Sequence, residues 1–486
     1  MAGNPGATME VHFKLFGTDG VSLQSQELTK ALRKRGWRVH SCASDVPDGA
    51  EGLRLPELSY QSDDALALRR SIFQPDATAD DKTTGQRLVE QIEERARTIR
   101  QRVEEYVDNH RIGLLHVRNI TSLPYNLAAT LAFHQLVVGR PDMRFLLQHH
   151  DLYWEGPNAK NFHTPYPEIA DLIARITCPD RANTTHVLIN PIAARALHER
   201  KGIEGVVIPD GFDFGRDVTV IDEVAFRSRL EVLTGNRTPI APDDLVVAMP
   251  ARVAINKAIE LAIQFVAGLE GRRAELEGAA GGLGARGRRL TAAGKIVLLL
   301  PQGEDLEENR DYFERLVAYA AHMGVTLAYG GNIVVPDRKF TPGDRERYPF
   351  YGTYQTIDLV CYPPEHEGFG NQAIEAVWAR RPLAVLEYPV FKAFVRDHVP
   401  HYISLGDVAG LGRLEEFGGL HVLREDVLQR ALDTAVTVLK DHELERRWVE
   451  ENMISLRRFC GMDTVCEQYV ELYDPGRKTL SEHHRS

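Results

Sequence analysis

Short apolar runs alternate with amphipathic segments along most of this chain. Residues 10–16 form the first run, and a glycine-containing turn, a predicted helix over 23–36 and a second run at 37–44 follow it. Residues 87–107 carry apolar side chains at steps of three and four, which predicts one face of a long helix. Strands that alternate with helices form parallel sheets with right-handed crossovers. The pattern therefore predicts an α/β protein.

The remaining apolar runs form two series. They are short and bounded by polar turns, as buried parallel strands are. The first series continues with 113–119, 144–151 and 186–190, and the second comprises 244–250, 295–301, 325–331, 357–364 and 382–388. Because 486 residues exceed one ordinary core, we predict two Rossmann-like, doubly wound parallel-sheet domains. Ligands bind beyond the carboxyl ends of such strands, so a cleft between the two domains is the expected active site.

The same pattern predicts the organisation of the chain. Residues 1–9 are small and polar and are expected to be disordered. The expected parts are an N-terminal acceptor-side domain over 10–213, a crossing segment over 214–242, a second, nucleotide-sugar-binding domain over 243–440, a helix over 441–473 that packs back on the first domain, and a tail over 474–486. The Gly/Ala/Arg-rich stretch 271–294 is interpreted as a helix end and a mobile surface loop.

Composition argues against several classes of protein. The net charge of −11 and the pI near 5.9 disfavour a nucleic-acid binder, which is usually basic, and a protein that coats anionic membranes. The five cysteines are scattered and lack zinc-ligand spacing, so we expect reduced, buried thiols and no metal site. No apolar leader or run of about 18 apolar residues is present. We expect a soluble cytoplasmic protein.

The stretch EHEGFGNQAIEA, residues 365–376, carries the most specific chemistry. Gly368 and Gly370 let the backbone approach a ligand closely, and the helix that follows favours an anion at its N-terminus. Glu367 and Glu375 flank this turn. A glycosidase also uses two carboxylates, which flank the glycosidic bond that it cleaves. The glycines and the cations elsewhere in the chain indicate a diphosphate ligand instead.

Arg252 and Lys257 follow the apolar run 244–250, at a predicted strand–helix junction. Arginine holds phosphate oxygens in a fork, and lysine acts as a point charge. Their spacing alone fits two solvated surface cations as well as it fits a phosphate-binding pair. The position at the carboxyl end of a strand favours phosphate binding. Glu375 has two interpretations as well: it hydrogen-bonds a sugar hydroxyl, or it only favours the dipole of its helix.

Polar residues also end strands of the first series. Adjacent strand residues point to opposite faces, so at most one of His149 and His150 reaches an active site, and a lone histidine there is more often structural. Tyr153, in the next loop, belongs either to an acceptor wall or to loop packing. Arg118 and Asn119, at another strand end, are candidates to receive an anionic acceptor, such as a phosphorylated or carboxylated small molecule.

Taken in order, these motifs resemble the GT-B glycosyltransferases of family 4, the retaining enzymes that use nucleotide sugars. The resemblance covers roughly residues 10–470 and rests on GTDGVS, HHD, IPDGFD, PARVAINK and EHEGFGNQAIE, the last being similar to the family's Glu–seven–Glu signature. It implies a GT-B fold and transfer of a hexose, with retention, from a nucleoside diphosphate sugar. We expect a UDP- or GDP-sugar as the donor and a small soluble acceptor, for which Arg118 and Asn119 suggest an anionic molecule as one candidate. The nucleoside diphosphate sugar is the co-substrate, and no metal or other cofactor is implied.

The resemblance also implies residue roles. Arg252 and Lys257 would grip the donor diphosphate and stabilise charge on the departing nucleotide. Glu375 would bind the donor ribose, and Glu367 and His150 would lie near the transferred sugar. The implied donor-binding set is completed by the glycines and backbone amides of Gly17, Gly20, Gly368, Phe369, Gly370 and Asn371. The candidate acceptor-binding set is Asp19, Arg118, Asn119 and Tyr153.

The chain departs from the family's pattern in places, and two other functions are weighed against it. Asp19 stands where many members have a further glycine, and it either faces the acceptor or caps the helix; Asp210 stands where asparagine is commoner. One alternative is a non-hydrolysing sugar-nucleotide epimerase, which the Glu–seven–Glu signature disfavours. The other is a catalytically silent nucleotide-sugar-binding regulator, which the intact charged set disfavours. A homodimer is left open.

Overall fold

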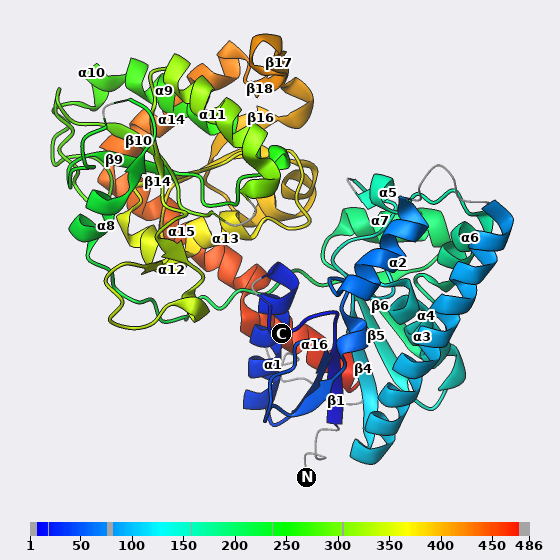
Figure 1. The fold of residues 1–486 in the computed structure, drawn as a ribbon. Coiled ribbons are helices and arrows are strands. Elements are labelled where there is room, and N and C mark those ends of the chain that lie inside the picture. Colours follow the sequence, from blue (N-terminus) through cyan, green and yellow to red (C-terminus); the bar gives the residue numbers. More distant parts are fainter. Residues whose placement is uncertain are drawn as a thin grey trace. The chain divides into compact units, whose positions relative to one another are not determined.

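The computed structural model describes residues 7–17, 19–74, 81–156, 158–235, 237–303 and 306–475. It divides into two compact units, which are described separately below. Unit 1 comprises Met1–Asp213 and Cys460–Ser486, and unit 2 comprises Phe214–Phe459 (Figure 1). Each unit contains a seven-stranded sheet covered by helices.

The sheet of unit 1 is parallel throughout, in the order β3-β2-β1-β4-β5-β6-β7. Its strands are β1 (Ala7–Val11), β2 (Arg38–Ala43), β3 (Gly52–Arg54), β4 (Ile112–Arg118), β5 (Arg144–His149), β6 (Thr184–Leu188) and β7 (Gly205–Val207). This is the doubly wound Rossmann order, in which the chain reverses direction across the sheet next to β1. The carboxyl ends of β1, β4 and β5 therefore meet at one edge.

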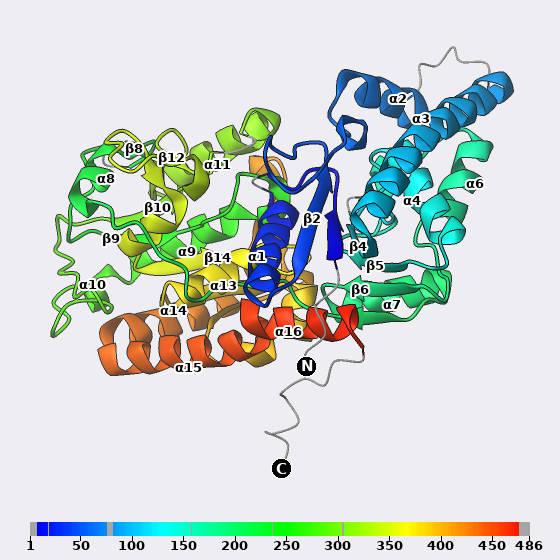
Figure 2. The ribbon, with the colours of Figure 1, turned by 90° about the horizontal axis from the view of Figure 1, so that it is seen from below.

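Helices cover both faces of this sheet. They are α1 (Gly20–Lys34), α2 (Asp63–Phe73), α3 (Asp81–His110), α4 (Leu127–Gly139), α5 (Asn158–Asn161), α6 (Pro167–Ile176), α7 (Pro191–Lys201) and α16 (Met462–Tyr473). Apolar side chains of α3, α4 and α6 share one core with the strands, and those of α1 and α16 share another. Helices α1 and α16, which are far apart in the sequence, thus pack side by side, with α16 in red and α1 in blue (Figure 2).

The sheet of unit 2 has the order β16-β15-β14-β9-β10-β11-β8, with only β8 antiparallel among its described strands. Its strands are β8 (Glu231–Val232), β9 (Leu245–Ala248), β10 (Ile296–Leu300), β11 (Thr326–Tyr329), β14 (Leu359–Tyr362), β15 (Leu383–Glu387) and β16 (Ile403–Asp407). Two further pairs are β12 (Val334–Val335) with β13 (Tyr348–Pro349) and β17 (Gly412–Leu414) with β18 (Leu420–Val422). Apart from β8, this is again a Rossmann order, so the predicted pair of doubly wound sheets is confirmed.

The helices of unit 2 are α8 (Glu223–Arg229), α9 (Ile259–Gly271), α10 (Arg273–Leu276), α11 (Arg310–His322), α12 (Phe350–Thr353), α13 (Asn371–Trp378), α14 (Glu425–Lys440) and α15 (His442–Cys460). Helix α9 packs against α11, α14 and the hairpin strand β18, while α13 packs against β14 and β15. The two helices that matter for the site, α9 and α13, thus follow neighbouring strands.

Several expected boundaries differ from the observed ones. Residues 7–9, expected to be disordered, belong to the buried strand β1, while residues 1–6 lie outside the described part of the chain. The expected crossing segment 214–242 lies within unit 2, where it supplies α8 and the antiparallel strand β8. The expected helix over 441–473 is two helices separated at Gly461. Most of the expected tail lies outside the described residues.

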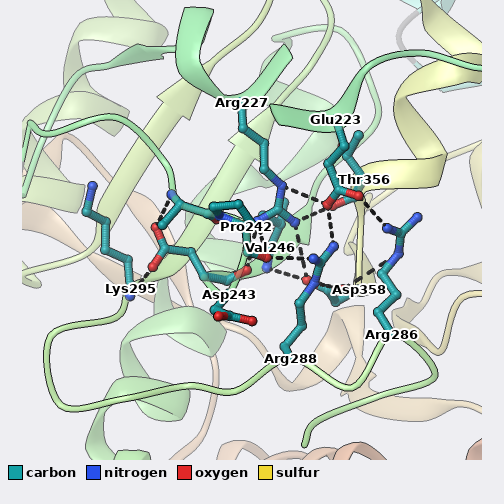
Figure 3. Close-up of polar contacts among 12 residues, drawn as sticks. Glu223, Arg227, Pro242, Asp243, Val246, Arg286, Arg288, Lys295, Thr356 and Asp358 are labelled. Atoms are coloured by element: carbon teal, nitrogen blue, oxygen red, sulfur yellow. Dashed lines mark hydrogen bonds and ion pairs between the residues drawn. The ribbon is translucent and has the colours of Figure 1, made fainter. Parts of the chain in front are cut away.

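The interpretation of residues 271–294 as a mobile surface loop is wrong for their central part. Arg288 is 7% exposed, and its Nε donates to Oδ1 of Asp358 at 2.9 Å. The same guanidinium donates to the carbonyl of Pro242 and pairs with Glu223 of α8 (Figure 3). Asp358 immediately precedes β14, so this buried network lies at the amino end of the strand, away from the edge where ligands bind. This loop is held in place because the side chain of Arg288 is buried and bonded to Asp358.

Candidate functional site

Two neighbouring strand–helix connections form the centre of the candidate donor site in unit 2. After β9 the chain makes one turn of 3-10 helix over Ile255–Lys257 and enters α9. After β14 it passes through a glycine-containing loop into α13. Because β9 and β14 are paired in parallel, both connections leave the same edge of the sheet. The backbone N–H of Glu365 donates to the carbonyl of Asn256 at 3.0 Å and joins the two connections.

Lys257 and Glu367 meet at this edge. The Nζ of Lys257 donates to Oε1 of Glu367, and the two side chains are 9% and 16% exposed. The hydroxyl of Tyr362, the last residue of β14, donates to the same carboxylate oxygen at 2.5 Å. A lysine has three donors, so Nζ can also contact a phosphate oxygen while it bonds Glu367. The sequence motifs predicted both charged residues, and the structure brings them together.

The turn that leads into α13 can only be made with glycine. Gly370 has a φ of +99°, and a Cβ on it would lie 1.8 Å from the hydroxyl oxygen of Tyr388. That hydroxyl donates to the carbonyl of Phe369 at 2.8 Å and so helps to hold the turn in its conformation. Helix α13 begins at Asn371, so its first N–H groups and the positive end of its dipole lie beside Gly368 and Phe369. This arrangement favours an anion.

Glu375 lies in the second turn of α13 and is 5% exposed. Its carboxylate accepts hydrogen bonds from Tyr354 at 2.7 Å and from Tyr351 at 3.4 Å. The guanidinium of Arg216 lies 4.1 Å above the ring of Tyr351. Burial raises the pKa of Glu375 to about 7, although the two tyrosines and Arg216 lower it. A carboxyl with this pKa changes charge near neutral pH.

This titration gives a prediction about donor binding. If the donor's ribose hydroxyls donate to Glu375, only the ionised carboxylate accepts both, so the donor KM should rise as pH falls below about 7. Tyr354→Phe removes a bond that favours the ionised form, and the rise should then begin at higher pH. The measurement is the donor KM between pH 5.5 and 9. Tyr348→Phe, a buried tyrosine of the same unit, is the control, and identical profiles for Tyr354→Phe and the unmodified protein would contradict the assignment.

Arg252 occupies the same β9–α9 connection as Lys257 and is exposed. It lies in the connection that leaves the carboxyl end of β9, where the resemblance expects a donor diphosphate. A long exposed arginine is able to swing onto a phosphate, whereas Lys257 is already held in place by Glu367. We retain Arg252 as a proposed donor contact.

In unit 1, His150 follows β5 and faces Asp210. Its backbone N–H donates to Oδ1 of Asn119 at 2.8 Å, and its Nδ1 lies 3.4 Å from Oδ1 of Asp210. Burial, with Arg118 and His12 nearby, holds the pKa of His150 well below its ordinary value, so the imidazole is neutral. His149 is buried on the other side and bonds His186 at 2.9 Å. Of the two histidines, His150 is the one that remains a candidate for a substrate contact.

Arg118 ends β4 at the expected sheet edge, but its side chain does not point outward to receive an acceptor. It is 1% exposed, its Nε donates to Oε2 of Glu10 at 2.8 Å, and its Nη1 donates to Oε1 of Gln148 at 2.6 Å. His116, on the same face of β4, bonds Glu10 and Tyr473 of α16. Side chains of residues two apart in a strand share a face, so Arg118 points under α16. We no longer assign it to the acceptor.

Other acceptor candidates also have structural roles. Asp19 caps α1: its Oδ1 accepts from the N–H of Ser22 at 3.0 Å and its Oδ2 from the Ser22 hydroxyl at 2.8 Å. The capping alternative therefore describes Asp19 best. A Cβ on Gly17 would lie 2.5 Å from the Asp19 carboxylate, so this cap requires the glycine; Gly20, the first residue of α1, is exposed. Tyr153 is 9% exposed and packs inside the loop, as its second interpretation held.

Some residues of the site escaped the sequence analysis. They are four tyrosines whose hydroxyls bond the two glutamates or the glycine-containing turn: Tyr351, Tyr354, Tyr362 and Tyr388. Only Tyr362 carried a signal, since it ends a strand directly before the glycine motif. The other three carry no such signal, because the partners of their hydroxyl groups are set by long-range packing and cannot be predicted from the sequence.

In the described ranges, no group of three or more histidine, cysteine, aspartate or glutamate side chains lies close enough together to hold a metal ion. Among the helices described, none has the length and apolar content needed to traverse a bilayer.

Two proteins named mannosylglucosylglycerate synthase are similar to this chain. The protein from Thermotoga maritima is 30% identical over 460 residues, which cover 94% of this chain and 96% of its own length. The protein from Petrotoga mobilis is 29% identical over 441 residues, which cover 90% and 95%. No family model matches the chain.

Solved structures share the fold. A sucrose-phosphate synthase from Thermosynechococcus elongatus superposes with a TM-score of 0.58, at 14% identity, over 97% of this chain and 98% of that one. An E. coli trehalose-6-phosphate protein bound with UDP-2-fluoro glucose gives 0.56, at 11% identity, over 96% and 99%. Such low identities show the fold alone, which is the predicted GT-B fold. The identity to the Thermotoga protein establishes that the chain belongs to the family of the mannosylglucosylglycerate synthases, and with the shared fold this makes it a GT-B glycosyltransferase, consistent with the resemblance to family 4.

Proposed function

We propose that this glycosyltransferase moves a mannosyl group, with retention, from a nucleoside diphosphate sugar to glucosylglycerate or a closely related small anionic acceptor. The enzyme class follows from the relatives, and their printed name supports the choice of sugar and acceptor. That name describes a product that carries a mannosyl and a glucosyl group on glycerate, a carboxylate. The choice of an anionic acceptor rests on this name, because Arg118, which suggested such an acceptor in the sequence, is buried against Glu10.

One observation carries the donor side of the proposal. Lys257 places a buried positive charge at the sheet edge where α9 and α13 begin. The N-termini of two helices and a lysine provide what a diphosphate requires, namely N–H donors, aligned dipoles and a cation. In the proposed complex Lys257 and Arg252 contact the diphosphate, and Glu375 accepts from the ribose. The solved neighbour with UDP-2-fluoro glucose supports this type of donor.

The charged residues support retention without an enzyme nucleophile. Glu367 bonds Lys257 and Tyr362, and Glu375 bonds two tyrosines, so both carboxylates are engaged in positioning. In the proposed step the acceptor hydroxyl attacks the anomeric carbon on the face from which the nucleotide leaves. The bond from that carbon to the phosphate oxygen breaks, and the acceptor's proton passes to that oxygen. Lys257 stabilises the charge that develops on the leaving diphosphate.

His150 fits a contact to the transferred sugar. Its Nδ1 faces Asp210, which favours the tautomer with the proton on Nδ1 and leaves Nε2 as an acceptor. Because the imidazole is neutral, Nε2 can accept a hydrogen bond from a sugar hydroxyl without changing charge. We assign His150 to this contact and Asp210 to its orientation.

The acceptor and the stereochemistry are tested together. Glucosylglycerate should be glycosylated, whereas glucosylglycerol, which lacks the carboxylate, should show a kcat/KM lower by about 100-fold or more. Nuclear magnetic resonance of the product should show the anomeric configuration of the donor. An inverted product would contradict the proposed mechanism, and equal use of the two acceptors would contradict the anionic acceptor.

A further inference from the structure

A short hairpin outside every motif contacts both connections of the candidate donor site. Strands β17 and β18 form it, and β18 packs against α9. Its residue His421 is buried, with 8% of its surface exposed. No sequence pattern marked this histidine, since it lies 54 residues after Glu367 in a segment without catalytic signals.

The imidazole of His421 lies between two carboxylates. Its Nδ1 is 3.3 Å from Oε1 of Glu260 and 3.2 Å from Oε1 of Glu365. Glu260 is in the first turn of α9, three residues after Lys257, and Glu365 is two residues before Glu367. One histidine therefore joins the two chain segments that carry the ion pair of the candidate donor site.

The charges around His421 favour its protonated form. The hydrogen bond to Glu260 raises the pKa of His421, and Glu365 adds to the rise, whereas burial and Arg413 of β17 lower it. Glu260 also accepts a bond from Tyr312 of α11 at 2.5 Å, and that tyrosine oxygen accepts from the N–H of Ile259 at 2.9 Å. Without the imidazolium the two carboxylates would repel each other, which would push Glu365 away from α9.

We propose that His421 is a positioning residue of the donor site, which sets the spacing between Lys257 and the Glu367 loop by bridging Glu260 and Glu365. The inference rests on the proposed function, because it assumes that the donor diphosphate binds where Lys257 and Glu367 meet. Below the pKa of His421 the bridge is present and the loops are held for the donor. As pH rises through that pKa, from the ordinary value near 6.5 upward, the bridge is lost and donor affinity falls.

The backbone of the hairpin is anchored independently of this side chain. The N–H of His421 donates to Glu260 at 2.9 Å, and its carbonyl accepts from the side-chain amide of Gln264 at 2.7 Å. The N–H of Leu423 donates to the same amide group at 2.8 Å. A substitution of the imidazole alone should therefore leave the hairpin on α9, which makes the inference testable without unfolding the site.

The test compares His421→Gln with His198→Gln, which removes a surface histidine that pairs with Glu204 in unit 1. Donor KM and kcat are measured between pH 5.5 and 9. Below the pKa of His421, His421→Gln should raise the donor KM by about three- to tenfold and change kcat less. In the unmodified protein KM should climb on the alkaline side towards the variant's value, whereas in the variant that alkaline rise should be absent. His198→Gln should behave as the unmodified protein.

A second variant tests the same bridge if His421→Gln folds poorly. Glu365→Gln removes the other carboxylate from a half-buried loop position and should raise the donor KM similarly, and the double variant should add little to either single change. Additive effects, or a normal donor KM in both single variants, would overturn the positioning role. Lys257→Ala separates the two proposals: if it also leaves turnover intact, the donor site itself is misassigned, whereas a strong loss there confines the failure to His421.

Discussion

Replacing Lys257 by alanine is expected to lower kcat/KM by about 100- to 1000-fold, most of it in kcat. The lysine is held by Glu367 at the edge where α9 and α13 begin, so its charge is in place before the donor arrives. Such a preorganised charge acts most strongly on the transition state, in which the leaving diphosphate gains negative charge. Lys257→Arg should recover little, because the side chain is 9% exposed and the site is shaped for an ammonium group.

Two controls decide how a loss in Lys257→Ala is interpreted. Lys440→Ala removes an exposed lysine from the end of α14 and should leave turnover unchanged. Adding Glu367→Gln to Lys257→Ala removes the carboxylate that the first change leaves without its cation. If activity returned in this double variant, the loss would come from the unpaired Glu367 and not from a missing phosphate contact. We expect no recovery. Unaltered turnover in Lys257→Ala would remove this residue from the mechanism.

Replacing Arg288 by methionine is expected to destabilise unit 2 by about 2–3 kcal/mol. The change removes the hydrogen bond from Arg288 to the buried carboxylate of Asp358 and its pairing with Glu223, while Arg227 and Arg286 remain beside both carboxylates. For a unit of this size, the change corresponds to a fall of about 5–10 °C in the melting temperature. Thermal unfolding followed by circular dichroism measures it.

Arg289→Met is the matched control for Arg288→Met, because Arg289 is the next residue and its side chain is exposed. Its effect should stay within about 0.5 kcal/mol. An equal, small effect of both substitutions would show that residues 271–294 form a surface loop after all. A large effect of Arg288→Met alone would support the buried network of Figure 3.

The sheets of both units could be predicted from the sequence because their strands are buried on two faces. Such strands are continuous apolar runs, and each of the predicted runs overlaps a strand of the structure; β9, for example, lies within 244–250 and β10 within 295–301. The short edge strand β8 was missed, since two residues carry no periodicity. The anchoring of Arg288 was missed for another reason: a stretch rich in Gly, Ala and Arg has the composition of a loop, and only the fold brings Asp358 to it.

Some residues of the candidate site could likewise be predicted from the sequence, and others could not. Lys257, Glu367 and Glu375 were identified because their charges stand at strand ends and helix starts, where position in sequence fixes position in space. Arg118 carried the same signal and misled, because it is the last residue of its strand and its side chain still lies on the face under α16. The tyrosines that hold Glu367 and Glu375, and the histidine that bridges Glu260 and Glu365, depend on long-range packing. Apart from Tyr362, which ends β14 directly before the glycine motif, no local pattern predicts them.

The central claim is tested most directly by acceptor-dependent release of a nucleoside diphosphate. The protein is incubated with a panel of UDP-, GDP- and ADP-sugars, each with and without glucosylglycerate, and the released nucleotide is measured. We expect release from a mannose donor only when the acceptor is present. Release of no nucleotide from any donor–acceptor pair, or interconversion of the donor sugar without an acceptor, would contradict it.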